Sequence, residues 1–107
     1  MRKDKSQQKH AYRRFKERYG INYNQRLSDY LRCAVHSGGA ISVCRSSNRV
    51  SIYDALFRPQ NGEVDDETLV GQLLIIRFAF DRNRNQVITA LPRDAQELDD
   101  LWTEDLF

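Results

Sequence analysis

The sequence predicts an α+β fold, in which two N-terminal helices pack on a four-stranded antiparallel sheet and an acidic helix ends the chain. Two observations carry this prediction. Apolar residues recur at helical spacing up to residue 37, and after the glycine pair 38–39 the period changes to that of strands. The 107 residues allow one core, so residues 1–107 are expected to form a single domain.

Both N-terminal helices are expected to be amphipathic. The first is predicted from about Ser6, a candidate N-cap, to Tyr19, with residues 1–5 as a basic arm. The second is predicted over residues 24–37, where apolar residues fall at the i, i+3, i+4, i+7 and i+8 positions of one helix face. These apolar residues are Leu27, Tyr30, Leu31, Ala34 and Val35.

Four strands are predicted after the glycine pair. They are expected at residues 40–45, 49–57, 70–80 and 86–91. The last two form a hairpin with a polar turn, and residues 58–69 between the two pairs are predicted to be an exposed acidic loop. Pro92 ends the last strand because proline has no N–H for the strand ladder.

Charge is distributed very unevenly along the chain. Residues 1–26 carry nine Lys or Arg against two acids, whereas residues 93–107 carry one Arg against six acids. A basic segment attracts a polyanion through the release of counterions. The acidic segment is predicted to form a helix with Leu98, Leu101 and Trp102 on one side. It either lies away from the basic surface or covers it.

The first helix carries a row of basic residues at steps of four, namely His10, Arg14 and Arg18. These side chains spread over about 80° of helix surface. An imidazole can take or give a proton near neutral pH, and guanidinium groups form two-pronged contacts with phosphate. The row is either a solvated charged stripe or half of a phosphate-handling site.

The pattern H-A-x-x-R-x-x-x-R at residues 10–18 precedes a last strand that reads V-I-T-A-L-P at residues 87–92. In this order the chain resembles the BECR-fold ribonucleases, which include barnase, colicin-type, EndoU and RelE-type nucleases, and in particular short bacterial toxins and phage proteins. The resemblance implies metal-free cleavage of RNA, in which the ribose 2′-OH attacks the neighbouring phosphate. The catalytic residues that it implies are His10, Arg14, Arg18 and Thr89.

Four more residues are expected to contact the substrate. They are Arg13, Tyr53, Arg82 and Arg84. Arg82 and Arg84 form the basic turn of the last hairpin. Taken by themselves, Tyr53 and Thr89 are better explained as residues that pack within a sheet. No cofactor or metal is expected, because Cys33, His36 and Cys44 lack a fourth zinc ligand at a recognisable spacing.

Two other classes of function fit the same sequence. One is a phage-encoded inhibitor without enzymatic activity, which would use the acidic residues 63–67 and the acidic C-terminal helix to dock on a host protein. The other is a plain nucleic-acid-binding module that works through the basic arm. RNA is therefore the first expected partner, and a protein inhibitor or a host protein that contacts the acidic helix is the second.

The chain shows no apolar run near the roughly 20 residues of a membrane span and no signal peptide before the first basic helix. We therefore expect no membrane partner and a cytoplasmic location, in the host cytoplasm if the protein is phage-encoded. The sequence does not indicate an oligomeric state.

Overall fold

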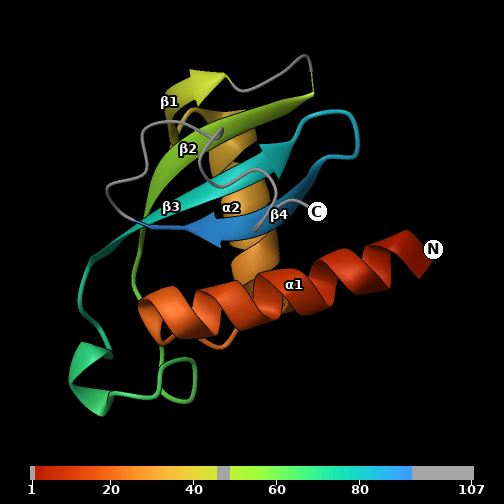
Figure 1. The fold of residues 1–107 in the computed structure, drawn as a ribbon. Coiled ribbons are helices and arrows are strands. Elements are labelled where there is room, and N and C mark those ends of the chain that lie inside the picture. The colour runs from red at the N-terminus through yellow and green to blue at the C-terminus, as the bar shows by residue number, and fades with distance from the viewer. Residues whose placement is uncertain (1, 46–48, 93–107) are drawn as a thin grey trace.

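The computed structural model describes residues 2–45 and 49–92 (Figure 1). In chain order its elements are α1 (Arg2–Tyr19), α2 (Gln25–Ser37), β1 (Ile41–Arg45), β2 (Val50–Phe57), the 3₁₀ helix η1 (Glu67–Leu69), β3 (Leu74–Asp81) and β4 (Gln86–Leu91). The predicted α+β class, with two helices and a four-stranded antiparallel sheet, is confirmed. The predicted C-terminal acidic helix lies outside the described residues.

The sheet is a simple meander with the strand order β1-β2-β3-β4, and each strand runs antiparallel to the next. α1 packs mainly along β4, while α2 crosses behind the middle of the sheet (Figure 1). Both helices contribute to one core on the same face of the sheet. The other face carries neither α1 nor α2.

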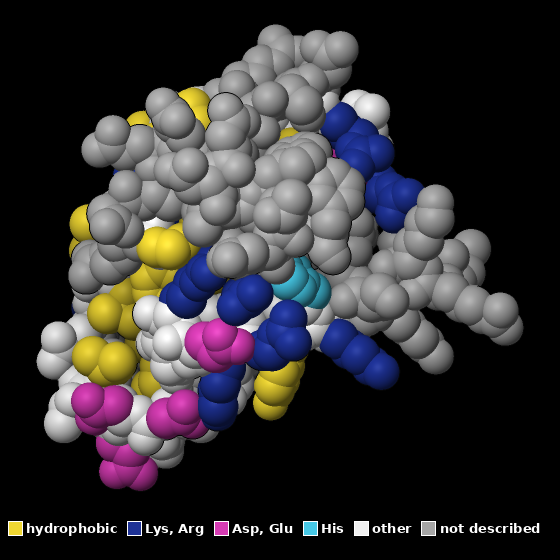
Figure 2. Space-filling view, viewed as in Figure 1, with side chains coloured by type: hydrophobic (Ala, Val, Ile, Leu, Met, Phe, Trp, Pro, Cys, Tyr) yellow, Lys and Arg dark blue, Asp and Glu magenta, His cyan; other side chains and the backbone are white. Residues whose placement is uncertain are grey.

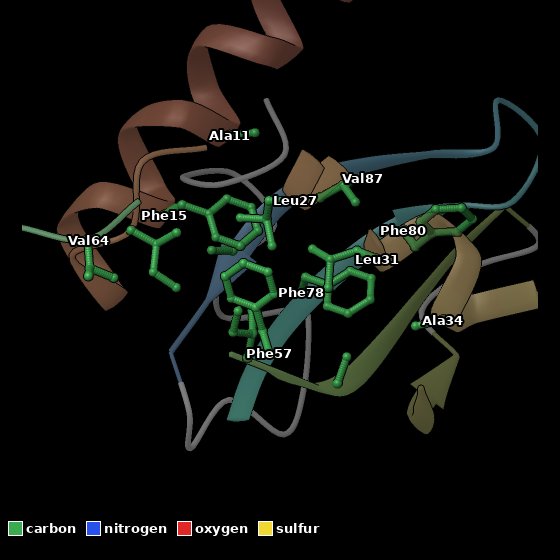
Figure 3. Packing of buried hydrophobic residues seen from close by; sticks show 14 residues of the cluster. Ala11, Phe15, Leu27, Leu31, Ala34, Phe57, Val64, Phe78, Phe80 and Val87 are labelled. Carbon is green, nitrogen blue, oxygen red and sulfur yellow. The ribbon is translucent and has the colours of Figure 1, made fainter. Parts of the chain in front are cut away.

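The main core lies between the helices and the sheet. Phe15 of α1, Leu27 of α2, and Phe57 and Phe78 of the sheet are at most 1% exposed and pack together (Figure 3). Each such side chain contributes roughly 1.5–3 kcal/mol when it is fully buried. The burial of Phe15 among these side chains therefore fixes α1 on the sheet, and the opposite side of the helix faces solvent.

A bulge in β4 determines which side chains face the helices. Phe78 pairs with Ala90, and both belong to the core under the helices, so the neighbouring pair Ala79 and Thr89 points to the other face. Ile88 is the extra residue of the bulge, since Phe80 already pairs with Val87.

The face of the sheet away from α1 and α2 has a smaller apolar cluster of its own. Its members are Val50, Ile52, Ala79, Ile88 and Leu91.

Two predicted boundaries were wrong, and one predicted loop is only partly exposed. α1 begins at Arg2, so residues 2–5 belong to the helix and do not form a separate arm, because no Gly or Pro interrupts helix formation before Ser6. β3 begins at Leu74 and not at residue 70, because the chain first turns through Gly71, whose φ is +80°. The predicted loop is not exposed throughout, since Glu63 is only 7% exposed.

An ion pair between the exposed Arg26 and the buried carboxylate of Glu63 joins the start of α2 to this loop. Arg26 donates from Nε to Oε2 of Glu63 over 2.7 Å and from Nη2 to Oε1 of the same carboxylate. Asn24 and the backbone N–H of Gln60 also donate to this carboxylate, at 3.1 and 2.8 Å. The hydrogen bonds from Arg26 are the largest cause that lowers the pKa of Glu63 to about 2.

In the part of the chain that the structure describes, neither helix combines the length and the apolar character that crossing a bilayer requires.

Candidate nucleic-acid interface

α1 separates apolar from basic side chains around its axis. Ala11 and Phe15 are at most 1% exposed and face the core, whereas Lys9 and Arg13 on the far side of the helix are exposed. Lys and Arg side chains gather over α1 with a histidine among them (Figure 2). We call one group of basic residues on this helix the basic face of α1. Its members are Lys9, His10, Arg13, Arg14 and Arg18.

The charges on this part of α1 do not cancel. Residues 9–19 hold five Lys or Arg and one acid, Glu17, which is shared by two arginines. Arg14 Nη1 lies 3.2 Å from Glu17 Oε2, and Arg13 Nε lies 3.7 Å from Glu17 Oε1. The pair of Arg13 with Glu17 is exposed, and such pairs contribute about 0–1 kcal/mol, so a phosphate group can replace the carboxylate at Arg13 at little cost.

Lys16 has a different role from the other cations of α1. Its ammonium group donates to Asn22 Oδ1 and Asp65 Oδ1, each over 2.6 Å. These contacts tie the helix to its own C-terminal connection and to the acidic loop. We therefore leave Lys16 out of the basic face.

His10 lies inside the basic face and is half-buried. Its Nδ1 atom is 3.4 Å from Arg13 Nη2, so the neutral ring can accept a hydrogen bond from the guanidinium group. The structure therefore brings His10 together with Arg13, one of the residues expected to contact substrate.

The C-terminal end of α1 is attached to the backbone of β4. Arg18 Nη1 donates to the carbonyl oxygen of Ala90 over 2.8 Å. The Tyr19 hydroxyl donates to the carbonyl of Leu91 over 2.7 Å and accepts from the backbone N–H of Arg77 over 3.0 Å. Arg18, which was predicted to be catalytic, thus has a structural partner, and Tyr19 is an anchor that the sequence did not reveal.

Thr89 does not meet His10. Its side chain is 0% exposed and points, with its partner Ala79, to the face of the sheet away from α1 and α2. The Thr89 hydroxyl lies 3.4 Å from the carbonyl of Ala90. The four residues that the resemblance implies as catalytic are therefore not all brought together, because the β4 bulge and the strand period turn the Thr89 hydroxyl away from the basic row.

Tyr53, another residue expected to contact substrate, is half-buried in the sheet. Its ring packs against Phe78 at 6.0 Å and against the edge of Phe80 at 6.2 Å, measured between ring centroids. These distances are typical of aromatic packing in a core. The structure therefore supports the packing interpretation of Tyr53.

Arg82 and Arg84 lie in the turn between β3 and β4, as predicted. The buried carboxylate of Asp81 organises this turn, because Oδ1 accepts the backbone N–H groups of Asn83 and Arg84, each over 3.0 Å. Arg49 Nε lies 3.3 Å from Oδ2 of the same residue. This turn is at the end of β4 away from Arg18, on the side toward which the N-terminal half of α1 points (Figure 1).

Among the residues that the structure describes, no three His, Cys, Asp or Glu side chains gather in a way that could hold a metal ion. Cys33 is an exposed thiol and Cys44 a half-buried one. His36 contacts Asn85 through Nε2 and the amide oxygen, which gives this histidine a partner in the β3–β4 turn.

Comparison with family models, curated proteins and solved structures finds no match to this chain. The resemblance to the BECR-fold ribonucleases therefore stays a hypothesis that rests on residues 10–18 and 87–92.

Proposed function

We propose that this protein binds RNA through the basic face of α1. The observation that supports the proposal is the excess of basic residues on a rigidly packed helix: residues 9–19 hold five Lys or Arg and one acid, Glu17. Of these five, Lys16 pairs with Asp65, and the other four belong to the basic face. Phosphate contacts from such a helix release counterions, which is the main source of affinity in sequence-independent binding. RNA is preferred over DNA because the resemblance to ribonucleases implies it.

The exposed side chains of α1 provide two kinds of contact. Lys9 and Arg13 reach solvent on one side of the helix and would meet the phosphates. Tyr12, half exposed at 50%, follows Lys9 by three residues and so lies one turn away, where its ring can stack on a base. Single-stranded RNA, whose bases are accessible, suits this combination better than a duplex.

A second candidate function is metal-free cleavage of RNA, in line with the resemblance. It is favoured by one observation, the position of His10 within the basic face at 3.4 Å from the Arg13 guanidinium. A histidine there could act as base toward a 2′-OH while Arg13 and Arg14 stabilise the charged phosphate. Thr89, on the other face of the sheet, has no part in this version of the site.

Binding can be tested by fluorescence anisotropy with a labelled single-stranded RNA at several salt concentrations. In the double variant Lys9→Gln/Arg13→Gln we expect binding about tenfold weaker and a smaller slope of log Kd against log salt, because two phosphate contacts are lost. The matched control is Arg32→Gln/Arg58→Gln, which removes two charges outside α1 and should change Kd less than about twofold. Equal losses in both variants, or no binding at low salt, would reject the proposal.

The second candidate is tested with the same RNA in excess chelator. Products with 2′,3′-cyclic phosphate ends that disappear in His10→Ala would establish cleavage. If the RNA stays intact at high protein concentration while binding is retained, the protein binds RNA but has no nuclease activity.

A further inference from the structure

The end of β4 lies beside the C-terminal end of α1. The carbonyls of Ala90 and Leu91 accept hydrogen bonds from Arg18 and Tyr19, the last two residues of α1. Residue 93 follows Leu91 by two positions, so residues 93–107 begin within a few residues of this attachment. The anchor lies in the described part of the chain.

The two segments have opposite charges, and the acidic segment is long enough to follow the basic face. Residues 93–107 carry six acids against Arg93, while residues 9–19 carry five Lys or Arg against Glu17. From Tyr19 back to Lys9 the helix spans about 15 Å. A chain of 15 residues reaches up to about 50 Å when extended, which is more than enough to follow the basic face from its anchored end.

We propose that residues 93–107 bind the basic face of α1 and compete with RNA for it. Each exposed ion pair contributes little, but a short tether holds the segment at a local concentration on the order of millimolar. The contact is intramolecular and weakens with salt. The acidic segment thus acts as an autoinhibitory polyanion that only a ligand with several phosphates displaces.

The competition with RNA rests on the proposed function, whereas the contact itself can be tested without RNA. Lysine positions make this test direct, because every lysine of the chain lies within α1. The four are Lys3, Lys5, Lys9 and Lys16. A carbodiimide, which joins a carboxylate to an amine without a spacer, therefore reports contacts of acidic residues with α1.

The cross-linking is done on the dilute full-length chain, and the monomer fraction is analysed by mass spectrometry. Lys16 and Asp65, 2.6 Å apart, provide an internal positive control. We expect amide links from residues 94–105 to Lys9 at low salt and their loss at about 500 mM salt, where charges are screened beyond a few ångströms. A link between Lys16 and Asp65 without any link from residues 94–105 would overturn the proposal.

The competition is measured with full-length charge variants. The variant Asp94→Asn/Glu97→Gln/Asp100→Asn removes three charges of the acidic segment. We expect it to bind RNA about tenfold more tightly than the wild type, since fewer counter-charges compete with the phosphates. An affinity equal to that of the wild type would overturn the competition.

A matched control separates local competition from a general change of charge. The variant Asp29→Asn/Asp66→Asn/Glu67→Gln removes three acids elsewhere and should change the affinity less than about twofold. An equal gain in both variants would assign the effect to net charge and reject the proposal. Cross-links without RNA binding by any variant would instead reject the proposed function and leave the contact standing.

Discussion

α1 and α2 lie on the same face of the sheet but use their arginines differently. In α2, Arg26 is matched by the buried carboxylate of Glu63 and lies over the ring of Phe57 at 5.1 Å. Arg32, nearly two turns further along α2, pairs with Asp29 at 3.5 Å. In α1, by contrast, two exposed or half-buried arginines share the single acid Glu17.

This difference separates cations that hold the fold together from cations that can serve a partner. A guanidinium group that is fixed to a buried carboxylate cannot be given to a ligand without leaving that carboxylate uncompensated. A cation that pairs with an exposed and shared acid, as Arg13 does with Glu17, can exchange that acid for a phosphate. Substitutions in the two helices should therefore affect different properties of the protein.

The largest effect is expected from Glu63→Gln, which breaks the pair with Arg26. We expect the free energy of unfolding to fall by about 3 kcal/mol, because the guanidinium group loses its charged partner in a partly buried site. Urea denaturation measures this loss. Glu67→Gln, an exposed acid of the same loop, is the control and should change stability by less than about 0.5 kcal/mol. A similar loss in both variants would show that the pair of Arg26 with Glu63 stabilises the fold no more than an exposed acid does.

The lowered pKa of Glu63 predicts how the stability of the protein depends on pH. The hydrogen bonds from Arg26 lower the pKa of Glu63 from an ordinary value of 4.5 to about 2 in the folded protein. Its contribution to stability is therefore complete above pH 4.5 and is lost as the pH falls toward 2. The difference in stability between the wild type and Glu63→Gln should shrink over this range. A difference that stays constant from neutral pH to pH 2 would contradict the assignment.

A smaller effect is expected from Tyr19→Phe at the anchored end of α1. The hydroxyl bridges the carbonyl of Leu91 and the N–H of Arg77, so its removal leaves two backbone groups without this partner. We expect a loss of about 1–2 kcal/mol in the free energy of unfolding. Tyr12→Phe on the same helix is the control, since Tyr12 is 50% exposed, and should have little effect. Equal stability of Tyr19→Phe and the wild type would show that the bridge does not hold α1.

The smallest effect is expected from Thr89→Val. Valine keeps the shape of threonine, and the hydroxyl has only a long contact of 3.4 Å to the Ala90 carbonyl, so stability should change by less than about 1 kcal/mol. RNA binding, and any cleavage, should be unchanged because the side chain lies on the face away from α1. Loss of RNA binding or of cleavage in a folded Thr89→Val protein would show that Thr89 belongs to the functional site.

The sequence by itself determined the elements with a strong local pattern. The apolar stripe of residues 24–37 predicted α2, and its members Leu27, Leu31 and Ala34 are buried, although Tyr30 stays 41% exposed at the edge. The strand at residues 86–91 was predicted with the bounds that β4 has, because a two-residue period followed by proline is a local signal. The basic character of α1 is equally a property of the sequence alone.

The tertiary structure decided where these elements place their polar groups. Arg26 and Glu63 are separated by 37 positions in the chain, and nothing local to either residue indicates that they pair. The bulge at Ile88 depends on how β4 meets β3, and it determines that Thr89 faces away from the basic row. Helical and strand periods arise from interactions between near neighbours in sequence, whereas partners and faces are chosen by contacts between segments that only the folded chain brings together.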